Sequence, residues 1–144
     1  MKSMKELVQN FPEQLKEAVQ IGEKAVFTKT KSPIQNVMIT GLGGSGIGGT
    51  IVAEVIASTC KVPVLVNKDY FIPACVNENS LVIVSSYSGN TEETLQAMKS
   101  ALDKKAKIIC ITSGGEVEKI AHKEKLDLIL IPSGMPPRAC LGYS

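Results

Sequence analysis

The chain has 144 residues, 44% of them hydrophobic, and a net charge of +2. That length can bury one hydrophobic core, and the composition is that of a folded globular protein rather than a disordered or collagen-like chain. The small net charge argues against nucleic acid or a membrane surface as a partner. The first residues lack the apolar stretch of a signal peptide, and no later run approaches the ~20 apolar residues of a membrane span. We therefore expect a cytoplasmic protein.

The cysteines argue against a metal site. The chain has four cysteines, far apart and with no C-x-x-C pair, and the single histidine His122. This pattern fits neither a zinc site nor a secreted disulfide framework, so we expect reduced thiols and no bound metal. His122 lies in a Lys- and Glu-rich segment and is predicted to be a solvated surface residue.

The chain begins with a helical pattern. Apolar residues from Leu7 to Val26 recur at three- and four-residue spacing. This predicts one amphipathic helix packed on a core, with a bend tolerated at Gly22. Residues 29–33 are predicted to be a linker. The expected division is an N-terminal helical segment, residues 1–30, followed by a second domain, residues 31–144.

The second domain alternates between strand and helix patterns. Five short apolar runs cover residues 37–40, 63–66, 81–84, 108–111 and 126–131. Helical patterns lie between them, among them residues 91–102 and 116–123. Such runs predict strands buried on both faces of a parallel sheet, hence a doubly wound five-stranded α/β fold flanked by helices. The expected flavodoxin-like strand order, 2-1-3-4-5, puts a ligand between the ends of strands one and three.

A glycine-rich loop follows the first strand. Residues 41–49 hold six of the 12 glycines, and a helical segment comes next. Glycine allows close backbone approach to a ligand, and a helix N-terminus favours an anion. Ser45 adds a hydroxyl donor to this loop. Two alternatives stay open: close packing without a ligand, or a dinucleotide site, because residues 41–46 match G-x-G-x-x-G and Asp69 follows the second strand.

A second polar loop follows the third strand and begins the next helix. Five of its residues are candidate phosphate ligands: Ser86, Ser88, Gly89, Asn90 and Thr91. The alternative is helix capping, by Thr91 or by a capping box from Asn90 to Glu93. Capping needs one such residue rather than a cluster of hydroxyls, so the loop favours a phosphate. Residues 112–115 are predicted to be either the rim of the pocket or a simple turn.

Three segments carry a resemblance to a known family. Residues 43–46, 86–95 and 136–143 together resemble the bifunctional phosphoglucose/phosphomannose isomerases, which are built from two sugar isomerase (SIS) domains. The Ser86–Thr91 sequence is typical of SIS domains in general, and Pro136–Ala139 narrows the match to this branch. The resemblance implies the N-terminal SIS domain of a homodimeric isomerase without a cofactor. The chain would then be truncated before a second SIS domain.

The resemblance also implies roles for individual residues. Ser86, Ser88 and Thr91 would hold the phosphate of the sugar. Gly44 and Ser45 would contact the sugar, and Arg138 would lie near the reacting carbons. An arginine there suits the interconversion of glucose 6-phosphate or mannose 6-phosphate with fructose 6-phosphate, because a guanidinium can stabilise the intermediate enediolate.

One departure from the family limits the expected activity. The family's proton-transferring glutamate, its ring-opening histidine and an assisting lysine come from the second domain, and the histidine comes from a partner subunit. We therefore expect little turnover from these 144 residues alone. A regulatory SIS module that senses a sugar phosphate is the second hypothesis; it would not need Arg138. A dinucleotide-binding oxidoreductase fragment is the third.

Overall fold

The computed structural model describes residues 3–144, within which five strands form one parallel sheet. The strands are β1 (Asn36–Thr40), β2 (Val64–Asn67), β3 (Ser80–Ser86), β4 (Lys107–Thr112) and β5 (Asp127–Leu130). The helices are α1 (Met4–Gln9), α2 (Phe11–Lys24), α3 (Gly43–Ile56), α4 (Glu92–Asp103) and α5 (Gly115–Lys123), with short 3-10 turns η1 (Pro137–Ala139) and η2 (Leu141–Tyr143). The strand order β2-β1-β3-β4-β5 confirms the predicted doubly wound, flavodoxin-like α/β fold.

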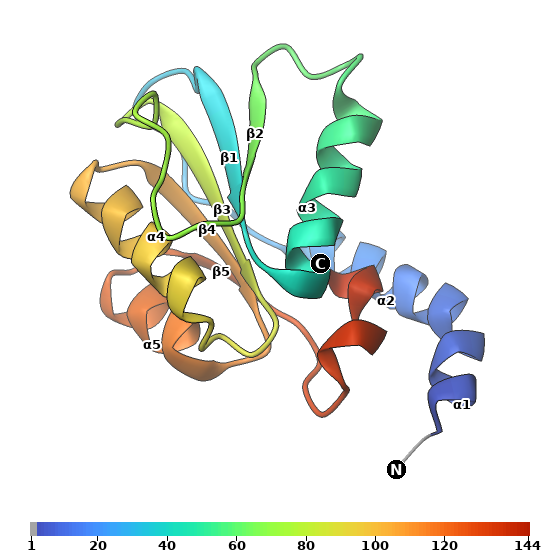
Figure 1. Cartoon of the computed structure of the whole chain (residues 1–144). Helices are drawn as coiled ribbons and strands as arrows, with labels where there is room; N and C mark the ends of the chain where they lie inside the picture. Colours follow the sequence, from blue (N-terminus) through green and yellow to red (C-terminus); the bar gives the residue numbers. More distant parts are fainter. Residues whose placement is uncertain (1–2) are drawn as a thin grey trace.

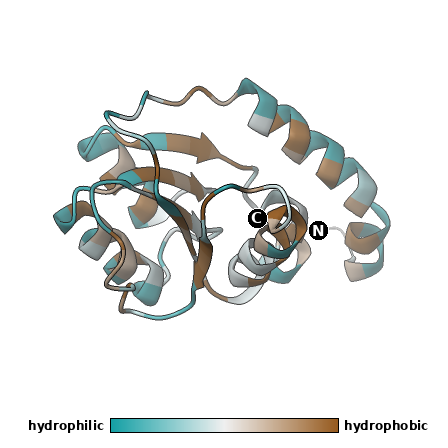
Figure 2. Ribbon diagram, turned by 90° about the horizontal axis from the view of Figure 1, so that it is seen from above, coloured by the Kyte–Doolittle hydropathy of each residue, from teal (hydrophilic) through white to brown (hydrophobic). Residues whose placement is uncertain are grey.

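Helices lie on both sides of the sheet. Figure 1 shows α4 and α5 on one face, and α3 with α2 on the other. The main core lies between the sheet and the helices α4 and α5. Figure 2 shows the strands coloured mainly as hydrophobic. Its buried residues are Met38, Val76, Val82, Val84, Met98, Ala101, Ile108, Cys110, Val117 and Ala121. Burial raises the pKa of the Cys110 thiol to about 12, and all four cysteines are free.

The two faces of the sheet are covered unequally. Along β4, buried Ile108 and Cys110 alternate with half-buried Ile109 and Ile111. The prediction of strands fully buried on both faces is therefore right for one face only. The reason is that α3 packs on β1 and β2, whereas α2 packs mainly against η2 rather than on the strands.

The N-terminal segment differs from its prediction. It forms two helices rather than one, because the chain breaks at Asn10 and Pro12 lies in the first turn of α2. Gly22 lies inside α2 without a break. The predicted apolar face is exposed rather than packed: Leu15 is 44% exposed and Val19 is 60% exposed.

A buried carboxylate that is ion-paired within the sheet also binds residue 28. Asp127, 7% exposed, accepts hydrogen bonds from the backbone N–H of Thr28 at 3.1 and 3.0 Å and pairs with Lys107. Burial disfavours the carboxylate, but the hydrogen bond from Lys107 and those from Thr28 outweigh it and hold the pKa of Asp127 below its ordinary value. These contacts fix residue 28 beside the first residue of β5.

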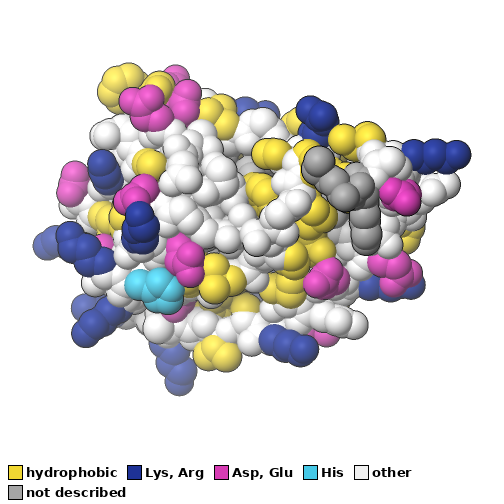
Figure 3. All heavy atoms as spheres, turned by 90° about the horizontal axis from the view of Figure 1, so that it is seen from below, with side chains coloured by type: hydrophobic (Ala, Val, Ile, Leu, Met, Phe, Trp, Pro, Cys, Tyr) yellow, Lys and Arg dark blue, Asp and Glu magenta, His cyan; other side chains and the backbone are white. Residues whose placement is uncertain are grey.

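The surface carries charges of both signs. Figure 3 shows lysine and arginine interspersed with aspartate and glutamate over one face, with hydrophobic side chains between them. His122 is exposed, as predicted, and lies 3.6 Å from Glu118. No helix among residues 3–144 is long and apolar enough to cross a membrane. In the same range, no group of three or more His, Cys, Asp or Glu could hold a metal ion.

Candidate functional site

The two polar loops meet at one edge of the sheet. Strands β1 and β3 pair in parallel, with Thr40 opposite Val84, so residues 41–46 and 85–91 leave the sheet side by side. The approach is close: a Cβ added at Gly41 would lie 2.7 Å from the carbonyl oxygen of Ser85. This is the carboxyl edge of the strands, at the point where the strand order changes direction, and it is where open α/β sheets bind ligands.

The glycines of the first loop serve two purposes. Gly46 and Gly49 are required by packing, because an added Cβ would lie 2.7 Å from the Gly41 carbonyl oxygen and 2.8 Å from Ile39 Cγ2, respectively. A Cβ added at Gly43 would meet nothing within 4 Å, and one added at Gly44 would meet only the Pro137 carbonyl oxygen, at 3.3 Å. Close packing therefore explains part of the loop, and the Gly43–Gly44 pair leaves open space.

The N-terminus of α3 offers unpaired donors. The helix starts after Leu42 without a side-chain cap. Ser45 is 7% exposed and its hydroxyl bonds to none of the described residues. Free N–H groups at a helix N-terminus attract anions and polar ligand atoms. Ser45 is thus suited to donate to a ligand held against the loop.

The second loop gathers its hydroxyls at the start of α4. Ser86 Oγ and Thr91 Oγ1 lie 3.2 Å apart, and the N–H of Gly89 donates to Ser86 Oγ at 3.1 Å. Thr91 is the N-cap residue of α4, yet its hydroxyl makes no capping hydrogen bond. Ser88 is exposed. These hydroxyls and the uncapped helix end form a donor set that suits an anion such as phosphate.

Asn90 does not cap the helix that follows it. The capping box suggested by Asn90 and Glu93 is wrong, since α4 has no side-chain cap. Asn90 Oδ1 instead accepts a hydrogen bond of 3.0 Å from the N–H of Glu116, in the first turn of α5. The side chain thereby holds two helix starts together, and its Nδ2 group stays free to donate.

Residues 112–115 pack against the backbone of the second loop. Ser113 Oγ donates to the carbonyl oxygen of Tyr87 at 2.6 Å. Gly89 adopts φ +69° directly against this segment, where an added Cβ would lie 1.8 Å from the Gly114 carbonyl oxygen. A Cβ added at Gly115 would lie 2.4 Å from the Ser88 carbonyl oxygen. The segment is therefore more than a simple turn, because it fixes the conformation of residues 87–90.

Arg138 lies in the segment that covers the glycine loop. The carbonyl oxygen of the preceding Pro137 faces Gly44, and Tyr87 accepts a 3.0 Å hydrogen bond from the N–H of Met135. Arg138 is exposed and forms no ion pair with residues 3–144. The fold thus brings together the three segments that the sequence singled out.

One neighbour of the site was not anticipated. Lys68, the first residue after β2, is exposed, and its Cε lies 3.4 Å from the position of a Cβ on Gly46. The signal was available in the strand order, because residues that follow β2 must lie beside those that follow β1. Lys68 adds a positive charge near the glycine loop.

The dinucleotide alternative gains no support. Asp69 Oδ1 accepts a 2.6 Å hydrogen bond from the N–H of Tyr70, so the carboxylate stabilises its own turn.

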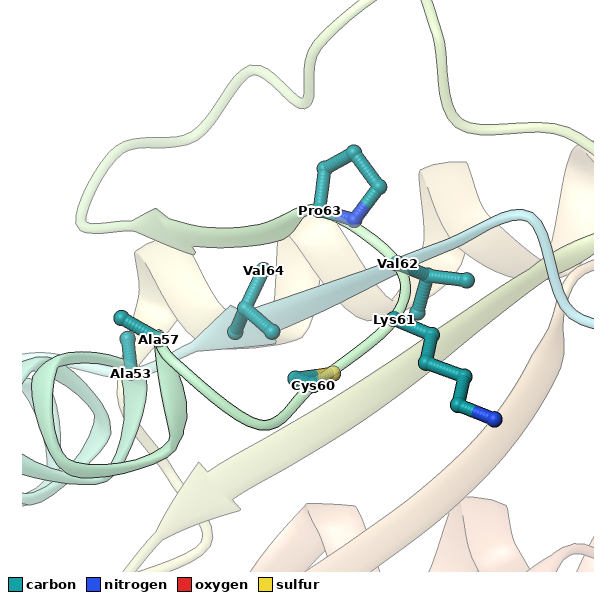
Figure 4. Close-up of a pocket in the computed structure, with 7 residues that line it drawn as sticks. All are labelled: Ala53, Ala57, Cys60, Lys61, Val62, Pro63 and Val64. Carbon is teal, nitrogen blue, oxygen red and sulfur yellow. The ribbon is translucent and has the colours of Figure 1, made fainter.

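A separate pocket lies between the end of α3 and the start of β2 (Figure 4), and its lining includes Ala53, Cys60, Lys61 and Val64. It is at the amino edge of the sheet, opposite the two loops.

The fold and the carboxyl-edge loops define an open parallel α/β domain with a site for an anionic ligand. The SIS domain profile matches residues 32–133, and the chain belongs to this family. It is 52% identical over 98% of its length to a bifunctional phosphoglucose/phosphomannose isomerase from Caldicellulosiruptor bescii. It is 46% identical over 75% of its length to a protein of the same name from Thermoplasma acidophilum. The predicted resemblance to the bifunctional isomerases is confirmed.

The chain spans less than half of these relatives, 42% of the first and 33% of the second. Among solved structures, a candidate phosphosugar isomerase from Clostridium difficile superposes with a TM-score of 0.76 at 21% identity, over 99% of this chain and 43% of that one. The Vibrio vulnificus NanR protein, solved with ManNAc-6P, superposes with a TM-score of 0.66 at 15% identity, over 95% of this chain and 56% of that one. These two likenesses support the fold.

Proposed function

We propose that this chain is the phosphosugar-binding domain of an isomerase that interconverts glucose 6-phosphate and mannose 6-phosphate with fructose 6-phosphate. The observation that carries the proposal is the donor set at the start of α4, where the Ser86 and Thr91 hydroxyls lie 3.2 Å apart. Ser86, Ser88 and Thr91, with the Nδ2 group of Asn90, would hold the phosphate, and Gly89 would shape the loop around it. Gly44 and Ser45 would contact the sugar, because they lie across the β1–β3 edge.

The reaction moves a proton between C1 and C2 through an enediolate. The negative charge that develops on the oxygens can be stabilised by the Arg138 guanidinium, which has no competing carboxylate among the described residues. A planar enediolate has no configuration at C2, so one site can serve both epimers. The proton-transferring base is proposed to come from a part of the protein other than these residues. His122 is unsuited, since it faces solvent beside Glu118 on α5.

The arrangement of the whole protein is part of the proposal. We infer a division into residues 1–30 and the SIS domain 31–144, a further SIS domain, and a cytoplasmic homodimer without a cofactor. The relatives' greater length supports a further domain. So does α3, whose outward residues Ile47, Ile51 and Val55 recur every four positions and are 51%, 49% and 73% exposed. A helix that is apolar on its outer side as well normally packs against another surface.

A thermal-shift titration tests the binding function. Fructose 6-phosphate at ~100 times its dissociation constant should stabilise the chain by about 2.7 kcal/mol, raising its melting temperature by roughly 8 °C. Fructose and NAD should leave it unchanged. The Ser86→Ala variant should lose most of the shift, whereas Ser58→Ala, at an exposed position near the end of α3, should keep it. A shift with NAD alone, or an equal shift with fructose, would refute the proposal.

A further inference from the structure

The segment that carries Arg138 has little regular structure of its own. Between Gly134 and Ser144 it forms only the 3-10 turns η1 and η2. Such short turns have weak hydrogen-bond geometry and are not stable in isolation. Contacts with the rest of the molecule must therefore fix the backbone around Arg138. In Figure 1 this segment, in red, lies between α2 and the start of α3.

Gln14 is the contact on the α2 side. It is the only buried residue of that helix, 6% exposed, whereas the apolar Leu15 beside it is 44% exposed. Its Nε2 donates to the Ala139 carbonyl oxygen at 2.8 Å, and its Oε1 accepts from the N–H of Gly142 at 2.8 Å. One amide thus bonds to both 3-10 turns.

The fit around Gln14 leaves little freedom. A Cβ added at Gly142 would lie 2.7 Å from Gln14 Oε1. A buried amide costs free energy when either end lacks a partner, so both hydrogen bonds favour a single position of the segment. Tyr143 adds a hydrogen bond to Glu17, one turn further along α2. The neutral amide offers no carboxylate to Arg138 and so leaves the guanidinium available to an anion.

The opposite side of Arg138 is held as well. Pro137, immediately before it, has its carbonyl oxygen 3.3 Å from the Cβ position of Gly44. Ala139, immediately after it, accepts the hydrogen bond from Gln14. The backbone is therefore fixed on both sides of Arg138, by the glycine loop and by the N-terminal helix. No sequence pattern had linked residue 14 to the site.

We propose that Gln14 is a positioning residue that holds Arg138 against the sugar end of the phosphosugar site. The inference rests on the proposed function, since it assigns Arg138 to the bound sugar phosphate. It gives the N-terminal helix, which contributes none of the proposed ligands, a role in binding. Phosphate alone should not depend on Gln14, because the 86–91 loop would hold it.

A double-mutant cycle tests the coupling between the two residues. The variants are Gln14→Met, which keeps the side-chain length but removes both hydrogen bonds, Arg138→Ala, and their combination. In calorimetric titrations of the 144-residue chain, Gln14→Met should weaken fructose 6-phosphate binding about tenfold, the size expected for losing a positioning hydrogen bond. In the Arg138→Ala background it should weaken binding less than twofold. Affinity for inorganic phosphate should not change, and Gln20→Met, exposed on the same helix, should match the parent chain.

Amide hydrogen exchange provides a readout that needs no ligand. The N–H of Gly142 bonds to Gln14 Oε1, so its exchange should accelerate at least tenfold in Gln14→Met and stay unchanged in Gln20→Met. Unchanged exchange at Gly142 would overturn the inference, as would equal weakening with and without Arg138. If the parent chain fails to bind fructose 6-phosphate while exchange at Gly142 accelerates, the proposed function fails and the structural role of Gln14 stands.

Discussion

The Gly89→Ala variant is expected to bind fructose 6-phosphate more than 100-fold more weakly than the parent chain. Its free energy of unfolding should be lower by about 3 kcal/mol. Gly89 has φ +69°, a conformation that costs an L-residue roughly 1–2 kcal/mol. An added Cβ would also lie 1.8 Å from the Gly114 carbonyl oxygen, a backbone atom that cannot swing aside. The 86–91 loop must then move away from residues 112–115, and the hydroxyls of Ser86 and Thr91 lose their alignment. Denaturant unfolding and calorimetry measure both effects.

Gly134→Ala is the matched control for this variant. Gly134 also has a positive φ, +87°, but nothing lies within 4 Å of its Cβ position. It should show the conformational cost alone, about 1 kcal/mol, with binding reduced less than threefold. Equal stability and equal affinity in the two variants would mean that the contact between Gly89 and Gly114 does not shape the site.

The second large effect is expected at the buried ion pair. Asp127→Ala should lower the free energy of unfolding by about 3 kcal/mol, because it leaves Lys107 without its carboxylate and Thr28 without an acceptor. Asp103→Ala, an exposed carboxylate at the end of α4, should change it by less than about 0.5 kcal/mol. Chemical denaturation at pH 7 compares the two variants.

The pH dependence follows from the lowered pKa of Asp127. The folded state binds this proton less readily than the unfolded state, whose carboxyl has a pKa of ~3.9. The stabilisation is therefore present above pH ~4 and is lost as the pH falls through the lower pKa of the folded state. The difference in unfolding free energy between the parent chain and Asp127→Ala should stay constant from pH 7 to pH 5 and become smaller in more acid solution. A difference that grows as the pH falls would contradict this role of Asp127.

The sheet could be predicted because buried strands are recognised from short runs of neighbouring residues in the sequence. The apolar runs and the glycine loop predicted all five strands, and the strand order then placed residues 41–46 beside 85–91. The loops could be recognised because a cluster of hydroxyls at a helix start exceeds what capping requires. Arg138 is a candidate only through the family resemblance, because an isolated exposed arginine carries no local signal in the sequence.

The failures concern contacts between distant parts of the chain. The apolar stripe of α2 predicted burial of Leu15 and Val19, but the last segment packs against a different side of the helix and buries Gln14. The alternative in which Asn90 caps the helix beside it fails, because its Oδ1 accepts a hydrogen bond from the N–H of Glu116, 26 residues later. Periodicity describes which side of a helix is apolar, not which surface is available to cover it.

The most direct test of the account is to map fructose 6-phosphate on the chain by amide chemical shifts. The largest changes should fall on residues 43–46 and 86–91, with a smaller group around Arg138, and titration with inorganic phosphate should move only residues 86–91. Changes centred on the pocket between Ala53 and Val64 instead, or no changes at a concentration of sugar phosphate that stabilises the fold, would contradict a phosphosugar site at the carboxyl edge of β1 and β3.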